Sequence, residues 1–345
     1  MKSCTEKSRS LSLDCIRIVA VLAVIMIHTA MEFIEFDFGS LSYMWGNIFD
    51  SLARVGVPLF VMVSGALMLN EKKDIPVKKV FSKYIFNVGL LFVAWSFIYV
   101  IYTTVGAILN RESVSVSSII KRFISGEFHM WYLIMIMGLY STIPILKLFV
   151  KKENAGKIAY IIVVSIIFVF VPVLLKSVSE FSEIFVFLSR QLERFHYGFI
   201  GVFPTYFITG WYVYHVDIKY KKTIYVLSAI SLLLIILLVQ ITGNYIDLYD
   251  NGNILVYLYS LGIFTFINDM CRNKVSTKII EKLSNLTFGV YIIHIIVIQV
   301  VNAFFDTAQL TPFSIIIRFG LTTVISFMGS YVLSKIPVLR KLIRF

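Results

Sequence analysis

Stretches of about 20 apolar, almost uncharged residues recur along the whole of this 345-residue chain. A segment of that length crosses the hydrocarbon core of a bilayer, about 30 Å thick, as one α-helix. Hydrophobic residues make up 58% of the sequence and charged residues only 15%, which leaves too little polar material to cover a soluble domain. We therefore predict an all-α, polytopic membrane protein in which one integral domain fills residues 1–345.

Ten transmembrane helices are predicted from these runs. Their approximate limits are 13–31, 47–69, 81–104, 130–150, 157–175, 197–215, 223–242, 254–270, 284–305 and 312–334. The segments 197–215 and 254–270 are the least regular, because they are rich in aromatic residues and interrupted by Gly or Pro. Membrane helices tolerate both residues where neighbouring helices satisfy the freed backbone groups. No small-residue cleavage site follows the first apolar run, so the first helix is expected to be retained.

Basic residues are distributed unevenly among the connecting segments. Most of the 32 lysines and arginines lie in alternate segments, whereas the predicted outer segments 32–46 and 243–253 contain none. Positively charged segments stay on the cytoplasmic side, so both termini are predicted to be cytoplasmic. This topology explains the net charge of +12 without nucleic acid as a partner. The Ile-, Lys- and Phe-rich composition favours a low-GC bacterium, and hence a multi-pass protein of the bacterial plasma membrane.

Three ionisable residues, Asp14, Arg17 and His28, interrupt the first apolar run, LSLDCIRIVAVLAVIMIHTA at residues 11–30. Each costs roughly 2.5–3.5 kcal/mol at the bilayer centre, so such residues face the bundle interior or a wet cavity. The spacing of eleven residues places His28 within about 20° of Arg17 around the helix and about 16 Å from it along the axis. Asp14 lies about 60° to the other side, which predicts one polar stripe. The structural alternative is an ion pair of Asp14 with Arg17 and a helix-to-helix hydrogen bond of His28.

Polar residues also lie in the outer half of other predicted spans. Arg54, in the second span, lies at about the depth of His28, where it can stabilise an anionic transition state or, alternatively, reach lipid headgroups. Glu127, His129 and Trp131 gather at the outer mouth of the fourth span. An aromatic belt explains Trp131 on its own, whereas His129 is a titratable group at the mouth of a predicted cavity. We expect these residues to contact substrate.

In the ninth span, Tyr291 and His294 are three residues apart and share one face near mid-bilayer. His294 is a second candidate histidine for a functional site, with a hydrogen bond between helices as the alternative. The cysteines Cys4, Cys15 and Cys271 are too few and too widely spaced for a disulfide framework or a zinc site. No metal centre is predicted.

Four segments occur in the order and at the spacing of a known family: LDCIRIVAVLAVIMIH, ARVGVPLFVMVSGALML, FHMWYLIMIMGLYSTIPIL and SNLTFGVYIIHIIVI. On these segments the chain resembles the acyltransferase-3 family of integral membrane acyltransferases over nearly its full length. Its closest resemblance is to the branch that contains the O-acetyltransferase of enterobacterial common antigen. The resemblance implies ten or so transmembrane helices. It also implies transfer of an acyl group from cytoplasmic acyl-CoA, expected to be acetyl-CoA, to a hydroxyl of a cell-envelope glycan or lipid-linked sugar.

The resemblance also assigns roles to individual residues. In the family the arginine and histidine of the first helix matter for activity, and they correspond to Arg17 and His28. Many members carry an Arg-x-x-Arg motif entering the third span, where this chain has Tyr84 and Asn87. Three nearby lysines are expected to attract the donor phosphates instead, as point charges: Lys78, Lys79 and Lys83.

A mechanism follows from these assignments as a hypothesis. A sugar hydroxyl is a poor nucleophile, and His28 is predicted to be the general base that takes its proton as it attacks the thioester. Asp14 and Arg17 are predicted to orient the acyl-CoA arm or the helix. The outer residues are predicted to meet the acceptor, and no bound cofactor is required because acyl-CoA is itself a substrate.

Two other classes of protein remain as alternatives. A transporter or exporter of a polysaccharide or small polar substrate fits a helix bundle with buried charges, although neither inverted repeats nor paired broken helices are evident in the sequence. A membrane-embedded sensor, or a partner of another envelope enzyme, would tolerate substitution of Arg17 and His28.

Overall fold

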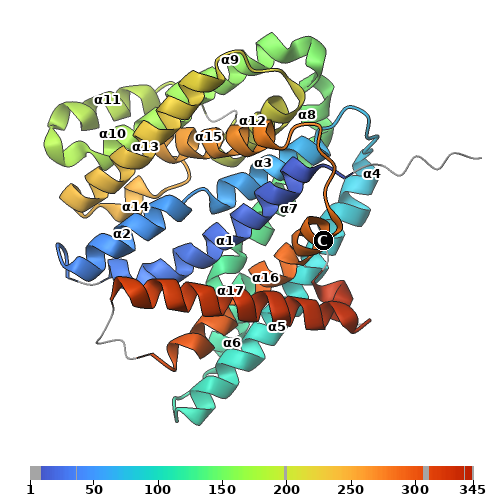
Figure 1. Cartoon of the computed structure of the whole chain (residues 1–345), viewed down its shortest axis with the longest axis vertical. Helices are drawn as coiled ribbons and strands as arrows, with labels where there is room; N and C mark the ends of the chain where they lie inside the picture. Colours follow the sequence, from blue (N-terminus) through green and yellow to red (C-terminus); the bar gives the residue numbers. More distant parts are fainter. Residues whose placement is uncertain (1–8, 36, 198–199, 306–310, 338, 344–345) are drawn as a thin grey trace, which may run out of the picture.

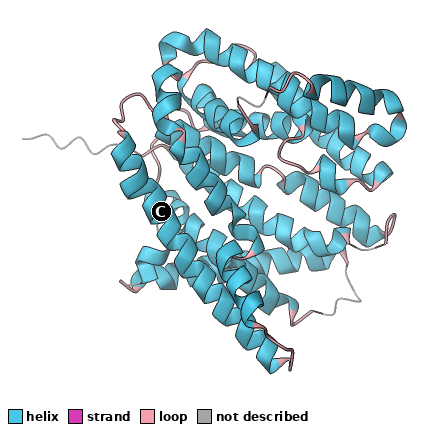
Figure 2. Cartoon of the chain, turned by 180° about the vertical axis from the view of Figure 1, so that it is seen from behind, coloured by secondary structure: helices cyan, strands magenta, loops and turns pink. Residues whose placement is uncertain are grey.

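The computed structural model describes residues 9–35, 37–197, 200–305, 311–337 and 339–343. Throughout these ranges the regular elements are helices, and the β-type pairing is an isolated bridge between Ser10 and Val275. Figures 1 and 2 show this helical assembly from opposite sides. The prediction of an all-α chain is confirmed.

Seven helical stretches in the described ranges are long and apolar enough to cross a bilayer. They are α1 (Leu11–Ile34), α2 with α3 (Leu41–Ala53 and Gly56–Met68), α4 with α5 (Val77–Lys79 and Phe86–Leu109, joined by the π-helical Val80–Ile85), α9 with α10 (Ala155–Ser165 and Val171–Ser177, joined by the π-helical Ile166–Phe170), α13 (Lys221–Thr242), α16 (Lys278–Asn302) and α17 (Pro312–Lys335). A bent stretch adds an eighth: α6 (Val116–Ser125) and α7 (Trp131–Ser141), followed after a bend of 49° by α8 (Ile143–Phe149). These lengths and compositions are those of a multi-pass membrane protein.

The two least regular predicted spans correspond to shorter helices. They are α12 (Val202–His215) and α15 (Ile254–Met270), of 14 and 17 residues. At 1.5 Å per residue these helices extend about 21 and 26 Å, less than the thickness of the hydrocarbon core. The total of ten crossings and the cytoplasmic location of both termini therefore stay predictions. The remaining α-helices of the described chain are α11 (Glu183–Glu193) and α14 (Tyr245–Leu248).

Proline residues account for two helix breaks that matter for the site. A proline ring clashes with the carbonyl of the residue four positions earlier and removes a hydrogen-bond donor. Pro58 stands in this relation to Arg54, and the helix is interrupted there: α2 ends at Ala53 and α3 begins at Gly56. Pro144 lies in the first turn of α8, so the predicted span 130–150 is divided near Thr142.

The crossing of α3 and α12 depends on two glycines. A Cβ atom added to Gly65 would lie 1.8 Å from the carbonyl oxygen of Phe207, and one added to Gly210 would lie 2.0 Å from that of Met62. The two backbones are therefore in direct contact. Small residues allow this close approach in membrane bundles, where packing rather than the hydrophobic effect holds helices together.

The helices α1 and α16 lie side by side and run in the same direction. Near their beginnings, Ser284 of α16 donates a hydrogen bond of 2.7 Å to Asp14 of α1. Further along both helices, the rings of His28 and His294 are 5.2 Å apart between centroids. In Figure 1, α1 with α2 and α3 lies between the group formed by α9 to α15 and the group formed by α5, α6, α16 and α17. The polar stripe of α1 thus faces α16 in the interior.

Arg318 is the third arginine inside a predicted span, and the structure explains it. Its side chain is only 1% exposed, and its Nη1 donates a hydrogen bond of 2.7 Å to Glu32 Oε2. The guanidinium also lies 5.7 Å from the ring centre of Phe33 and 5.1 Å from that of Phe305. The pair therefore links α17 to the C-terminal end of α1, and Glu32 compensates the buried charge of Arg318.

Candidate functional site

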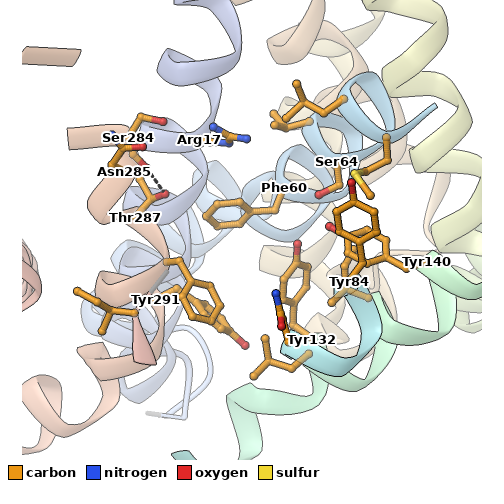
Figure 3. A pocket seen from close by; sticks show the side chains of 18 of the residues that line it. Arg17, Phe60, Ser64, Tyr84, Tyr132, Tyr140, Ser284, Asn285, Thr287 and Tyr291 are labelled. Atoms are coloured by element: carbon orange, nitrogen blue, oxygen red, sulfur yellow. Dashed lines mark hydrogen bonds between the residues drawn. The ribbon is translucent and has the colours of Figure 1, made fainter. Parts of the chain in front are cut away.

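A cavity of about 480 Å³ opens beside the first turns of α1, α5 and α16. Figure 3 shows its polar side chains converging from different helices. Those with a hydroxyl, amide or guanidinium group are Arg17, Ser64, Tyr84, Asn87, Tyr132, Tyr140, Ser284, Asn285, Thr287 and Tyr291. The exposed Lys73 and Lys83 complete the lining with positive charge. The cavity therefore combines a cationic rim with an aromatic, hydroxyl-rich interior.

Arg17 points into this cavity from the second turn of α1 (Figure 3). Its Nη1 lies 3.5 Å from Oδ1 of Asp14, three residues earlier on the helix. Asp14 does not line the cavity and is only 1% exposed. Its carboxylate also receives hydrogen bonds of 2.8 Å from Arg9 and 2.7 Å from Ser284. The ion pair that was the structural alternative for Asp14 is present, and Asp14 joins it to the beginning of α16. Its role in orienting the acyl-CoA arm or the helix stays a prediction.

A cluster of three histidines lies further along α1 and α16. His28 comes from α1, His294 from α16, and His129 from the short 3₁₀ turn Phe128–Met130 that precedes α7. The ring centroid of His294 is 5.2 Å from that of His28 and 5.3 Å from that of His129. His129 is 2% exposed and His294 is fully buried, whereas His28 is partly exposed and packs 5.3 Å from the ring of Phe128. The two candidate histidines outside the first helix therefore join the first-helix histidine at one site.

The nitrogen atoms of this cluster are short of partners. His294 Nδ1 is hydrogen-bonded to the backbone carbonyl oxygen of Tyr291. The remaining buried nitrogens, namely His28 Nδ1, His294 Nε2 and both ring nitrogens of His129, have no hydrogen-bond partner. Buried polar atoms without partners are rare in folded proteins and mark places where a ligand, water or proton transfer is accommodated. In the part of the chain that the structure describes, no group of three or more His, Cys, Asp or Glu residues could hold a metal ion.

Tyr291 connects the cavity to the histidine cluster. Its side chain lines the cavity, and its ring lies 5.6 Å from that of His129 and 6.0 Å from that of His294. Its hydroxyl donates a hydrogen bond of 2.6 Å to the carbonyl oxygen of His129. Tyr132, also in the cavity lining, packs 5.6 Å from the Tyr291 ring. The two tyrosines therefore stand where the two parts of the site meet.

Arg54 occupies the break between α2 and α3. It forms an ion pair with Asp50, whose side chain is 1% exposed, and its guanidinium carbon lies 4.1 Å above the ring centre of Tyr249. It also lies within electrostatic range of His28. These contacts direct Arg54 into the protein, so a positive charge is held near the histidine cluster. Its predicted contact with substrate stays a prediction.

The remaining predicted residues are spread more widely. Glu127 is partly exposed and precedes the turn that carries His129. Trp131 is 40% exposed and packs 5.6 Å from the ring of Phe203. Its place in an aromatic belt, and its contact with substrate, stay predictions. Of the three predicted donor-binding lysines, Lys83 alone lines the cavity. Lys78 is exposed, and Lys79 Nζ lies 3.4 Å from the backbone oxygen of Asp74.

Sequence reasoning missed several residues of the cavity. Lys73, Tyr140, Ser284 and Asn285 line it, and none was predicted as a site residue. In the structure Ser284 lies six residues after the beginning of α16, as Arg17 does after the beginning of α1. The predicted span began only at residue 284, so that depth was missed. Lys73 lies in the loop before α4, and a loop offers no periodicity from which such a placement can be predicted.

The sequence model of the acyltransferase domain family Acyl_transf_3 matches residues 10–335. No curated protein and no solved structure matches the chain. The matched region contains α1, the whole described cavity except Ile343, and all three histidines of the cluster. A match over nearly the whole chain, with the predicted arginine and histidine at the centre of the bundle, establishes the family. The chain belongs to the acyltransferase-3 family and is a membrane acyltransferase.

Proposed function

We propose that the protein is a membrane O-acyltransferase that moves an acetyl group from acetyl-CoA to a hydroxyl of a cell-envelope glycan or lipid-linked sugar. The observation that carries this proposal is the position of Tyr291, which lines the Arg17 cavity and also contacts His129 and His294. A thioester bound in the cavity and a hydroxyl bound at the histidines would meet beside this residue. The choice of acetyl and of a glycan rests on the resemblance to the enterobacterial common antigen branch.

The chemistry of the cavity suits an acyl-CoA donor. The nucleotide end of CoA carries several phosphate charges, and Lys73 and Lys83 at the rim, with Arg17 inside, supply the opposite charge. The aromatic and hydroxyl side chains further in suit an amide-containing arm. Lysine-rich segments favour the cytoplasm, so we place this opening there and the histidine cluster towards the outside, in a bacterial plasma membrane.

The proposed reaction is a single acyl transfer. The acceptor oxygen attacks the thioester carbonyl, the bond from carbon to sulfur breaks, and CoA leaves as the thiolate. His28 takes the proton of the hydroxyl as the new C–O bond forms, and that proton is finally delivered to the thiolate sulfur. The oxyanion that develops on the carbonyl is stabilised by a nearby cation, for which Arg54 is the candidate.

The test is a transfer assay in proteoliposomes. Purified protein is incubated with acetyl-CoA labelled in the acetyl group and with envelope glycan, and both the glycan and the vesicle lumen are analysed. Covalent label in the glycan supports the proposal. Accumulation of unmodified substrate in the lumen without covalent label would instead support the transporter alternative and overturn the enzyme proposal.

Substitution of Lys83 by Gln is expected to raise the KM for acetyl-CoA about threefold to tenfold, since an exposed charge contact contributes roughly 1 kcal/mol. The KM for acetyl-pantetheine, which lacks the nucleotide, should stay within error of the unsubstituted value. Both constants are measured from initial rates at fixed acceptor concentration.

A suitable control is the same substitution at Lys219, an exposed lysine outside the cavity lining. It removes an equal charge from the surface and should leave both constants unchanged. Equal effects of Lys83→Gln on the full-length and the truncated donor would contradict a phosphate contact.

A further inference from the structure

The two ring nitrogens of His294 have different surroundings, and the reaction proposed above gives this residue no role. The partner of His294 Nδ1 is a backbone carbonyl oxygen, which can only accept a hydrogen bond. Nδ1 of His294 must therefore carry the proton, so Nε2 of the neutral ring has a free lone pair. That Nε2 atom is buried and has no partner. The structure thus fixes the tautomer of His294 and leaves one hydrogen-bond acceptor inside the cluster.

Among the aromatic rings that contact His294, the His28 ring has the shortest distance between centroids. A ring nitrogen lies about 1.1 Å from its centroid, so two imidazoles that share one hydrogen bond of about 2.9 Å have centroids about 5.1 Å apart. The observed separation is 5.2 Å, and the two rings are inclined by 35°. His129 is at 5.3 Å, but its contact with His294 is edge-to-face at 84°, which directs the edge of one ring at the face of the other. His28 Nδ1 and His294 Nε2 are not hydrogen-bonded to each other in this structure, but the separation of the rings brings such a bond within reach of a small ring rotation.

The burial of the His28 ring points the same way. Nδ1 of His28 is buried without a partner, although the ring as a whole is partly exposed. The accessible part of the ring is therefore the part away from Nδ1, which contains Nε2. If Nδ1 carries the proton, Nε2 has the lone pair that a general base needs.

We propose that His294 is a positioning residue for His28. When the His28 ring turns so that its Nδ1 faces Nε2 of His294, the Nδ1–H of His28 donates to that unpartnered atom, while the Nδ1–H of His294 donates to the carbonyl oxygen of Tyr291. This chain holds the His28 tautomer in which Nε2 is free to take the proton of the acceptor hydroxyl. It also stabilises the imidazolium formed during attack, as the third group of a nucleophile–base–orienter triad does. The inference rests on the proposed function, in which His28 is the base, and it gives His294 a role other than contact with substrate.

The test compares three substitutions of His294 in the full-length protein. Leu removes the acceptor, Gln can place a carbonyl oxygen near the Nε2 position, and Asn is one carbon shorter. We expect His294→Leu to lower kcat by roughly 100-fold to 1,000-fold with both KM values unchanged, and His294→Gln to retain kcat within about tenfold. His294→Asn should resemble the Leu variant. Each variant is also checked for a monodisperse elution profile in detergent.

The matched control is His215→Leu. His215 lies in α12, and its Nε2 is hydrogen-bonded to the carbonyl oxygen of Ala66, away from the cluster. This variant should keep kcat near the unsubstituted value, which separates loss of an imidazole as such from loss of this one.

The outcomes separate the two proposals. A His294→Leu variant that keeps kcat within about threefold, or that raises the acceptor KM alone, overturns the positioning role. If His28→Asn is inactive in the same series, the proposed function stands, although the positioning role of His294 does not. If both variants are fully active, the proposed base is wrong as well. Should the Leu variant fail to fold, equal kcat values for the Gln and Asn variants overturn the inference, and a higher value for Gln supports it.

Discussion

Substitution of His28 by Asn is expected to reduce kcat for acyl transfer by about 10²-fold to 10⁴-fold, the usual contribution of a general base. Asn is close to the size of the imidazole and preserves the Phe128 and His294 packing better than Ala does. The amide cannot accept a proton at neutral pH, so the loss should fall on kcat and leave donor binding in the Arg17 cavity intact. Initial rates with labelled acetyl-CoA at several acceptor concentrations give both constants.

The same substitution at His215 is the control for His28→Asn. It changes another partly buried histidine of the bundle that lies outside the cluster, and it should leave kcat unchanged. Near-normal transfer by His28→Asn, in protein that elutes as the unsubstituted protein does, would refute the assignment of His28 as the base.

Substitution of Gly65 by Ala is expected to abolish the folded state in detergent. The added methyl group would lie 1.8 Å from the carbonyl oxygen of Phe207, far inside van der Waals contact, and backbone atoms cannot move aside as a flexible side chain can. Separation of α3 from α12 would forfeit the packing along both helices, so we expect destabilisation beyond about 4 kcal/mol, which is exceptional for one substitution. Fluorescence-detected size-exclusion chromatography after a temperature series measures the loss.

Gly138→Ala is the matched control, because no atom lies within 4 Å of the added methyl group. Alanine is favoured over glycine in a helix by about 1 kcal/mol, so this variant should be as stable as the unsubstituted protein or slightly more stable. Gly210→Ala should behave like Gly65→Ala, since its methyl group would lie 2.0 Å from the carbonyl oxygen of Met62. A Gly65→Ala protein with an unchanged melting temperature would show that the two backbones are not in contact.

Much of the fold could be predicted because a bilayer imposes a simple rule on the sequence. Long apolar runs predicted seven of the apolar helical stretches and the α7–α8 part of the bent eighth, but not α6. The rule works less well where a helix is surrounded by protein: α12 is 14 residues long, and most of its central residues are buried against neighbours. Such a helix needs neither bilayer length nor uniform hydrophobicity. The break near Thr142 depends on Pro144, which a count of apolar residues does not register.

The candidate site could be predicted in part, for a similar reason. Helical periodicity places Arg17 and His28 on one face of α1, and Tyr291 with His294 on one face of α16, and both pairs do face the interior. Periodicity cannot bring separate helices together. The arrival of His129 beside His294 depends on how a turn before α7 packs against α16, which is a property of the tertiary structure. The contacts of Asp14 with Arg17, Arg9 and Ser284 likewise depend on the tertiary structure.

The hydrogen bond from the Tyr291 hydroxyl to the His129 carbonyl oxygen has a consequence for unwanted hydrolysis. In the proposed reaction, water that reached the thioester beside the histidines would compete with the acceptor. None of the three histidines lines the described cavity, and Tyr291 stands between that cavity and the cluster. The Tyr291 ring can move only if this hydrogen bond breaks. The surroundings have a low dielectric constant, so hydrogen bonds to water do not replace it there. In the proposed reaction, movement of the Tyr291 ring is therefore expected to loosen the turn that carries His129, and the same bond is expected to limit hydrolysis of the donor.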